Sequence, residues 1–294
     1  LSALVAGLNI PSWQAYVSEL VPRADLLNAV TLNSAQFNAA RAVGPGIAGV
    51  VLATLGPSWG FFLNAVSFGA VIGALLLVRT VDAERERPTG TVRSQFADGV
   101  RFVRSHGELL LCIALVVLVA GLAQPVFQLM PVFADDVFGV GESGYGLLAG
   151  ALGFGGVLAT PVIGGWGDLV RRSRLVAGAL VLDGVMLVVF ASSGSLWVGV
   201  PAIACCGAAF LAVVSTLNTT VQLLVSEQFR GRVMAIYVMG FTAAYPVGSL
   251  VQGAIAEAVG VQPTVAGAGA LLVVVTLVAR LTPVFDRLDR KRPV

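Results

Sequence analysis

The sequence predicts an all-α membrane protein, and three observations support this prediction. Hydrophobic residues make up 57% of the chain and charged residues only 12%, whereas soluble domains carry about 25% charged residues. Uncharged runs recur along the chain, and several exceed the roughly 20 residues that a helix needs to cross a bilayer. The alternation of apolar and polar residues typical of a membrane β-barrel is absent, so helices are the expected spanning elements.

Nine membrane-spanning helices are expected from these runs. The sequence GPSWG at 56–60 divides one overlong run, and SSGS at 192–195 divides another. The expected spans are 1–18, 30–55, 60–78, 109–130, 144–166, 174–191, 197–222, 233–256 and 263–281.

Basic residues are confined to alternate connections, with Arg41 as the exception. They lie at positions 23, 79–104, 171–174, 230–232 and 280–292. The intervening connections 56–60, 131–143, 192–196 and 257–262 contain no Lys or Arg. The positive-inside rule therefore predicts a multi-pass plasma-membrane protein with a cytoplasmic C-terminus. Because the chain starts within an apolar run and without Met, we expect upstream helices to be missing.

An internal repeat supports this expectation. The pattern Gln14, Val17, Ser18, Glu19 recurs as Gln222, Val225, Ser226, Glu227, at an offset of 208 residues. The repeat predicts two six-helix halves, twelve spans in all, of which the first half keeps its last three helices. The expected units are these three helices (1–78), a cytoplasmic linker with an amphipathic helix (79–108), a six-helix half (109–283) and a cytoplasmic tail (284–294).

A loop motif lies between the second and third helices of the second half. Its pattern G-x-x-x-D-x-x-R-R is formed by Gly164, Asp168, Arg171 and Arg172, and it resembles the loop signature of the major facilitator superfamily. The resemblance implies a cytoplasmic latch between the two halves, with Glu19 and Glu227 as candidate acids for the Arg residues. The alternative is that these Arg residues only anchor the helix at the cytoplasmic surface.

A second motif lies in the sequence RAVGPGIAG at 41–49. It resembles the Gly-Pro motif in the fifth helix of drug/proton antiporters of this superfamily, carried here by Gly44, Pro45, Gly46 and Gly49, although Ala48 departs from the usual glycine. Proline bends a helix, and the glycines leave a smooth face for a neighbouring helix. Ordinary packing of small residues is the alternative.

Two longer stretches narrow the resemblance to one branch of the superfamily. They are SELVPRADLLNAVTLNSAQFNAARAVGPGIAG and MPVFADDVFGVGESGYGLLAGALGFGG, and they are similar to the enterobactin-exporter-like and macrolide-efflux-like proteins. The resemblance covers residues 1–283 and implies export of drugs or siderophores, usually in exchange for protons. The resemblance implies that roughly the first three helices of that family are missing from this chain.

Charged and amide side chains within the expected spans are candidates for a substrate or proton pathway. Arg41 is expected near mid-membrane, where it could balance the charge of a substrate or of a proton-carrying acid, or brace two helices. Asp183 could carry a proton or make a structural hydrogen bond or ion pair. The resemblance implies that helices one, four, seven and ten of the twelve line a cavity. Helices four, seven and ten correspond to the expected spans 1–18, 109–130 and 197–222. Their polar candidates here are Asn9, Gln14, Gln124, Gln128, Asn218 and Gln222. Each amide could line the cavity or bridge two helices, and Pro125 predicts a local bend.

These features favour an alternating-access exporter of a small hydrophobic or siderophore-like compound, with the proton gradient as its energy source. We expect a monomer in the lipid bilayer, with no cofactor, metal or nucleic acid. A membrane enzyme is disfavoured because His106 is the single His and no catalytic triad is evident. A non-transporting scaffold or sensor with the same fold remains the alternative.

Overall fold

The computed structural model describes residues 54–77, 92–166 and 170–289, together with Gln36, Ile47 and Val51. Every regular element within these ranges is a helix, which confirms the all-α prediction for the described part of the chain. In chain order the elements are α3 (Pro57–Leu77), α4 (Val92–Ser105), α5 (Gly107–Leu122), α6 (Val126–Val132), the π-helix η1 (Phe133–Val137), α7 (Gly141–Trp166), α8 (Arg172–Ser192), α9 (Leu196–Leu224), α10 (Glu227–Val259), α11 (Val261–Arg280) and the 3-10 helix η2 (Phe285–Asp289).

Six of the described helical segments are long and apolar enough to cross a membrane, and a shorter apolar segment, Ser143–Ala159, lies within α7. The structure places helices at the expected spans from 60–78 onward, although the span expected at 109–130 is divided into α5 and α6. The count of nine stays a prediction, because 1–18 and most of 30–55 lie outside the described residues.

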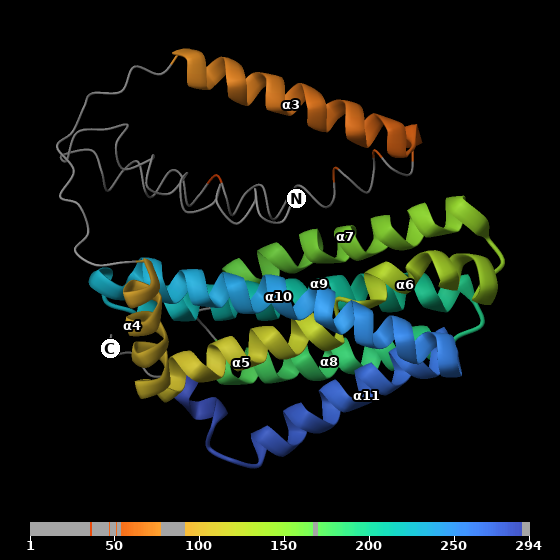
Figure 1. The fold of residues 1–294 in the computed structure, drawn as a ribbon. Coiled ribbons are helices and arrows are strands. Elements are labelled where there is room, and N and C mark those ends of the chain that lie inside the picture. Colours follow the sequence, from red (N-terminus) through yellow and green to blue (C-terminus); the bar gives the residue numbers. More distant parts are fainter. Residues whose placement is uncertain are drawn as a thin grey trace.

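Helices α5 to α11 lie alongside one another as a bundle, and α4 lies across one end of it (Figure 1). The closest pairings are α7 with α9, α8 with α9 and α11, and α5 with α10. Fully buried aromatic and aliphatic side chains, such as Phe133, Phe190 and Leu217, fill the interior. Large apolar side chains such as Trp197 and Leu250 are exposed on the outside, as expected for a surface that faces lipid tails.

Glycines allow α7 and α9 to pack at backbone contact. A β-carbon on Gly155 of α7 would overlap the carbonyl group of Ala204, and one on Gly207 of α9 would overlap the carbonyl group of Leu152. The two glycines therefore face the partner backbone from opposite sides of one interface. Small residues are the usual means of close helix approach in lipid, where hydrophobic exclusion from water does not drive packing.

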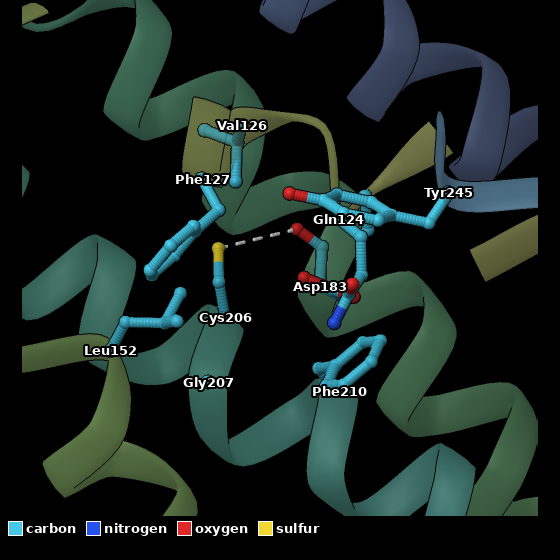
Figure 2. Close-up of a pocket in the computed structure, with 10 residues that line it drawn as sticks. Gln124, Val126, Phe127, Leu152, Asp183, Cys206, Gly207, Phe210 and Tyr245 are labelled. Carbon is cyan, nitrogen blue, oxygen red and sulfur yellow. Dashed lines mark hydrogen bonds between the residues drawn. The ribbon is translucent and has the colours of Figure 1, made fainter. Parts of the chain in front are cut away.

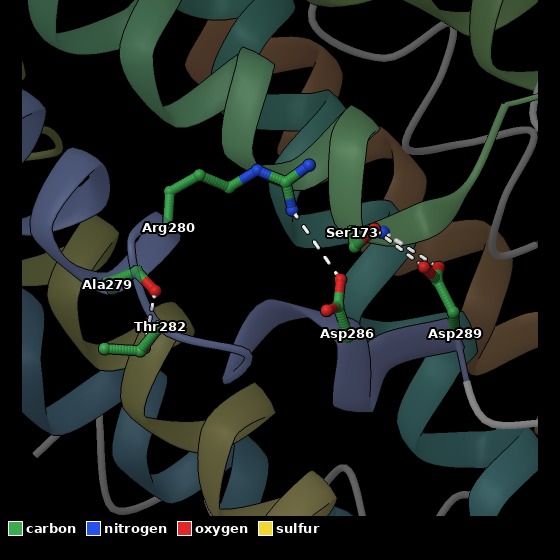
Figure 3. A network of polar contacts seen from close by, with 6 residues as sticks. All are labelled: Ser173, Ala279, Arg280, Thr282, Asp286 and Asp289. Atoms are coloured by element: carbon green, nitrogen blue, oxygen red, sulfur yellow. Dashed lines mark hydrogen bonds and ion pairs between the residues drawn. The ribbon is translucent and has the colours of Figure 1, made fainter.

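The C-terminal helix η2 is fixed to the bundle end that carries the start of α8. Phe285 and Leu288 are fully buried. Asp289 accepts hydrogen bonds from the backbone N–H of Ser173, at 3.1 Å, and from its hydroxyl group, at 2.7 Å (Figure 3). A carboxylate at a helix start satisfies N–H groups that lack a partner within the helix. Asp289 of η2 therefore caps the first turn of α8.

Helix α4 occupies the segment for which an amphipathic helix was expected, and it packs against the first turns of α10. Val103 is buried in the core, and the rings of Phe102 and Phe229 stack with centroids 4.2 Å apart. Phe96, another apolar residue of α4, is 44% exposed. The apolar residues of α4 therefore serve partly to dock the helix on the bundle, and its position at a membrane surface stays a prediction.

Candidate functional site

The candidate site begins at the break between α5 and α6. Pro125 has no N–H group, so the carbonyl of Gly121 loses its usual donor four residues ahead. The N–H of Val126 donates instead to Ala123, at 3.4 Å, which also frees the carbonyl of Leu122. A buried carbonyl without a partner is costly in lipid.

Gln252 of α10 supplies the missing donor. Its side-chain nitrogen Nε2 lies 3.1 Å from the carbonyl oxygen of Gly121 and 2.9 Å from that of Leu122. The side chain is 5% exposed, so both bonds lie within the protein. The helix can therefore remain interrupted at mid-length because another helix satisfies its backbone.

A cavity of about 320 Å³ opens beside this break (Figure 2). Such a volume suits a small organic molecule. Its lining residues come from the break, α6, α7, α8, α9 and α10, near the middle of each long helix. They are Ala123, Gln124, Val126, Phe127, Leu152, Asp183, Cys206, Gly207, Phe210 and Tyr245.

Asp183 supplies the acidic group of this cavity. The residue is 1% exposed, and its oxygen Oδ2 has no hydrogen-bond partner among the described residues. Its backbone carbonyl accepts the weak Sγ–H donor of Cys206, at 3.8 Å. A carboxyl oxygen that the protein leaves unsatisfied at a cavity wall is suited to hold a proton or to bind a ligand donor.

Aromatic and amide groups form much of the remaining wall. Phe127 of α6 and Phe210 of α9 contribute rings on two sides, and Gln124 contributes an amide at the break. Figure 2 shows Gln124 and Phe210 close to Asp183 within one pocket. The combination of apolar rings with a few polar groups is typical of sites for small organic ligands.

Tyr245 joins the cavity to α6 and was not among the residues predicted from sequence. The amide Nε2 of Gln128 donates a hydrogen bond of 2.6 Å to its phenol oxygen. Gln128 therefore bridges two helices next to the cavity. A Tyr beside Pro246 in an apolar span was an available signal, since a phenol group needs a polar partner in lipid.

The structure brings together only some of the predicted pathway residues. Gln124 and Asp183 line the same cavity, and Gln128 contacts it through Tyr245. Gln222 donates instead to Asn218 at 2.6 Å, one turn away on α9, and neither residue lines this cavity. Four other predicted features lie outside the described residues: Asn9, Gln14, Arg41 and the Gly-Pro motif of Gly44, Pro45, Gly46 and Gly49.

The predicted latch is described only in part. Gly164 lies near the end of α7, Arg171 directly precedes α8, and Arg172 is its first residue. Asp168 and Glu19 lie outside the described residues, as does the side chain of Glu227. The latch therefore stays a prediction. At this end of the bundle, Asp289 accepts a hydrogen bond from the backbone N–H of Ser173, the residue after Arg172.

Comparison with known proteins agrees with the helical membrane architecture. Residues 1–291 match a family model of the major facilitator superfamily described as transmembrane secretion effector. The chain is 28% identical over 301 residues to the multidrug efflux pump Tap of Mycolicibacterium fortuitum, a match that covers 98% of this chain and 73% of that protein.

Two further relatives are also named as a pump or a transporter. The Tap pump of Mycobacterium tuberculosis (strain ATCC 25618 / H37Rv) is 29% identical over 86% of this chain and 61% of its own length. The staphyloferrin A transporter of Staphylococcus aureus is 25% identical over 95% of this chain and 69% of its own length. The chain thus spans between three-fifths and three-quarters of these transporters, and the family model covers it almost from end to end. This chain belongs to the transmembrane secretion effector family of the major facilitator superfamily.

Proposed function

We propose that the protein exports a small hydrophobic or siderophore-like compound by alternating access, in exchange for protons. The observation that carries this proposal is the Oδ2 oxygen of Asp183, which has no hydrogen-bond partner among the described residues and lies in an aromatic cavity where the α5–α6 helix is interrupted. Interrupted helices at the membrane midplane are a recurrent location of substrate and ion sites in transporters. The names of the relatives, a multidrug efflux pump and a siderophore transporter, support the same class.

In the proposed cycle, each group of the cavity has a separate task. Phe127 and Phe210 contact the apolar body of the compound, and Gln124 bonds its polar groups. Asp183 holds a proton in one access state and releases it in the other. Because the α5–α6 break lies at the same level, α6 can tilt relative to α5 as access changes, while Gln252 keeps the freed carbonyls bonded.

The proposal extends to the setting of the protein. The protein acts as a monomer in the plasma membrane, with its C-terminus in the cytoplasm and the proton gradient as its energy source. No cofactor takes part in the cycle. The end of the bundle that carries α4, η2 and the start of α8 is then the cytoplasmic end.

Transport assays in proteoliposomes test this proposal. The protein is reconstituted and offered a panel of hydrophobic fluorescent compounds and radiolabelled siderophores, with and without a pH gradient. We expect at least one compound to move in a gradient-dependent manner, and Asp183→Asn to abolish this dependence. Asp135→Asn removes an exposed acid outside the cavity and should transport normally. If no compound moves, or if both variants behave alike, the proposal fails, and the first result favours a non-transporting scaffold.

A further inference from the structure

A second pocket lies between α4 and the first turns of α10, apart from the central cavity. Its volume is about 290 Å³, and its lining residues are Asp98, Arg101, Phe102, Ser105, Phe229 and Arg232. Two guanidinium groups and one carboxylate face this groove, so its net charge is positive. The transport cycle proposed above uses none of these residues.

Packing holds the two walls of the groove in place. Gly99 of α4 lies close to α10, because a β-carbon there would lie 3.0 Å from Cδ1 of Ile236 and 3.2 Å from Cβ of Arg232. The stacked rings of Phe102 and Phe229 form the apolar side. The guanidinium of Arg232 lies 5.4 Å from the ring centroid of Phe229. The groove is therefore a fixed feature of the α4–α10 contact and not a gap between independent side chains.

The guanidinium of Arg101 is exposed and only weakly paired, so a ligand can replace its partner. Its contact with Asp98 measures 3.4 Å, and the Arg101 side chain is 81% exposed. Exposed ion pairs of this kind contribute little stability, since water competes for both partners. A phosphate group would offer Arg101 a charge-assisted and potentially bidentate partner in place of this pair.

In the membrane orientation proposed above, the groove lies at the level of the lipid headgroups. Helix α4 lies across the bundle end (Figure 1), and the apolar span of α10 begins at Phe229, inside the groove. The groove thus adjoins the start of an apolar span on one side and carries Arg side chains on the other. This arrangement matches a phospholipid, in which an anionic phosphate adjoins an apolar glycerol and acyl region. Basic pockets at the cytoplasmic ends of membrane helices commonly bind such headgroups.

We propose that the α4–α10 groove is a binding site for the phosphate of an anionic glycerophospholipid. Arg101 and Arg232 bind the phosphate from the two helices, and the Phe102–Phe229 stack contacts the glycerol region. Through this contact a lipid headgroup links the linker helix α4 to α10. The site is therefore defined by its position between two helices and not by positive charge alone.

Native mass spectrometry of the detergent-solubilised full-length protein tests the proposal. The protein is titrated with phosphatidylglycerol and with phosphatidylcholine of the same acyl chains, and inorganic phosphate is added as a competitor. The groove variant is Arg101→Gln/Arg232→Gln. Its matched control, Arg104→Gln/Arg230→Gln, removes the same charge from the same two helices at exposed positions that do not line the groove.

The proposal predicts preferential binding of phosphatidylglycerol, a loss of about tenfold or more in apparent affinity for the groove variant, and a clearly smaller loss for the control. Equal losses of affinity in the groove variant and the control variant would show diffuse electrostatic attraction and would overturn the proposal. Equal binding of phosphatidylglycerol and phosphatidylcholine would also overturn it. Displacement of the lipid by millimolar phosphate would assign the site to free phosphate instead. If the groove variant does not fold, the exposed single variant Arg101→Gln decides, with an expected loss of about threefold against Arg104→Gln.

Discussion

The side-chain amide of Gln252 on α10 donates a hydrogen bond of 3.1 Å to the carbonyl oxygen of Gly121, at the end of α5. A second bond from the same nitrogen reaches Leu122. One turn earlier on α10, Gly248 packs against the backbone of Gly121 so closely that a β-carbon would overlap it. Consecutive turns of α10 therefore contact the α5–α6 break, one through a glycine and one through an amide.

Replacing Gln252 with leucine should destabilise the protein more than the loss of one side chain suggests. Gln252→Leu keeps a similar volume but leaves two buried carbonyls without a donor. We expect a loss of about 1–3 kcal/mol, measured as a lower melting temperature in detergent. Thr242→Val is the control, because the exposed hydroxyl of Thr242 bonds only carbonyls of its own helix. Equal shifts for both variants would show that the amide does not stabilise the break.

Asp289 should stabilise the start of α8 in a way that depends on Ser173. Asp289→Ala removes both acceptors of the Ser173 bonds, and we expect a loss of about 1–2 kcal/mol, as for other helix caps. Asp286→Ala is the control, since Asp286 meets Arg280 only at 4.0 Å with a side chain 69% exposed (Figure 3). That variant should change stability by no more than about 0.5 kcal/mol.

A double-mutant cycle separates the Ser173–Asp289 contact from general effects. Ser173→Ala retains the backbone N–H donor and removes the hydroxyl donor. If the contact is direct, Ser173→Ala should cost less in the Asp289→Ala background than alone, by about 0.5–1 kcal/mol. Full additivity would contradict a direct role of the hydroxyl bond.

Much of the described fold could be predicted from the hydrophobic runs and from the turn sequences that divide them. The lengths of these runs, together with GPSWG and SSGS, predicted α3, α7, α8, α9 and α11 within three residues at each end, because a bilayer fixes how long an apolar helix must be. The start of α10 was expected six residues too late, and α5 and α6 were expected as one span. The break at Pro125 was predicted as a bend, since proline removes a backbone donor. Its stabiliser was not predicted, because Gln252 lies about 130 residues away in an ordinary apolar run.

For the cavity, too, the sequence predicted individual residues but not which residues from distant segments meet. Asp183 and Gln124 could be selected because polar groups are rare and costly within a membrane span. The sequence could not show that they share one cavity, since they belong to elements whose adjacency depends on packing. Asn218 and Gln222 illustrate the converse: a spacing of four residues on one helix lets the amide of Gln222 donate to that of Asn218 within α9 and not across to another helix.

Gly207 should tolerate no larger residue, because its α-carbon faces the backbone of α7. Gly207→Ala places a methyl group on the carbonyl of Leu152 and must push α7 and α9 apart. Overpacking of this kind costs about 1–3 kcal/mol or more, and we expect a lower melting temperature and poor membrane expression. Gly178→Ala on α8 is the matched control, since nothing lies within 4 Å of its β-carbon, and it should be neutral or slightly stabilising. Similar behaviour of the two variants would contradict the close α7–α9 approach.

Cys206 should report on the opening of the cavity, and Tyr245 should control that opening. The Cys206 thiol lines the cavity and its residue is 2% exposed, so in a Cys112→Ser/Cys205→Ser background N-ethylmaleimide should label it slowly. Tyr245→Phe keeps the ring and removes the acceptor of the Gln128 bond. Since one hydrogen bond contributes about 1 kcal/mol, labelling should accelerate about fivefold.

Two comparisons decide whether the faster labelling comes from the cavity. Tyr145→Phe makes the same chemical change on α7, away from the lining residues, and should leave the labelling rate unchanged. A compound found to be transported should slow the labelling of Cys206 at saturating concentration, because it would occupy the space beside the thiol. Acceleration by both Tyr variants would indicate general loosening of the bundle, and an unchanged rate in Tyr245→Phe would show that the Gln128–Tyr245 bond does not close the cavity.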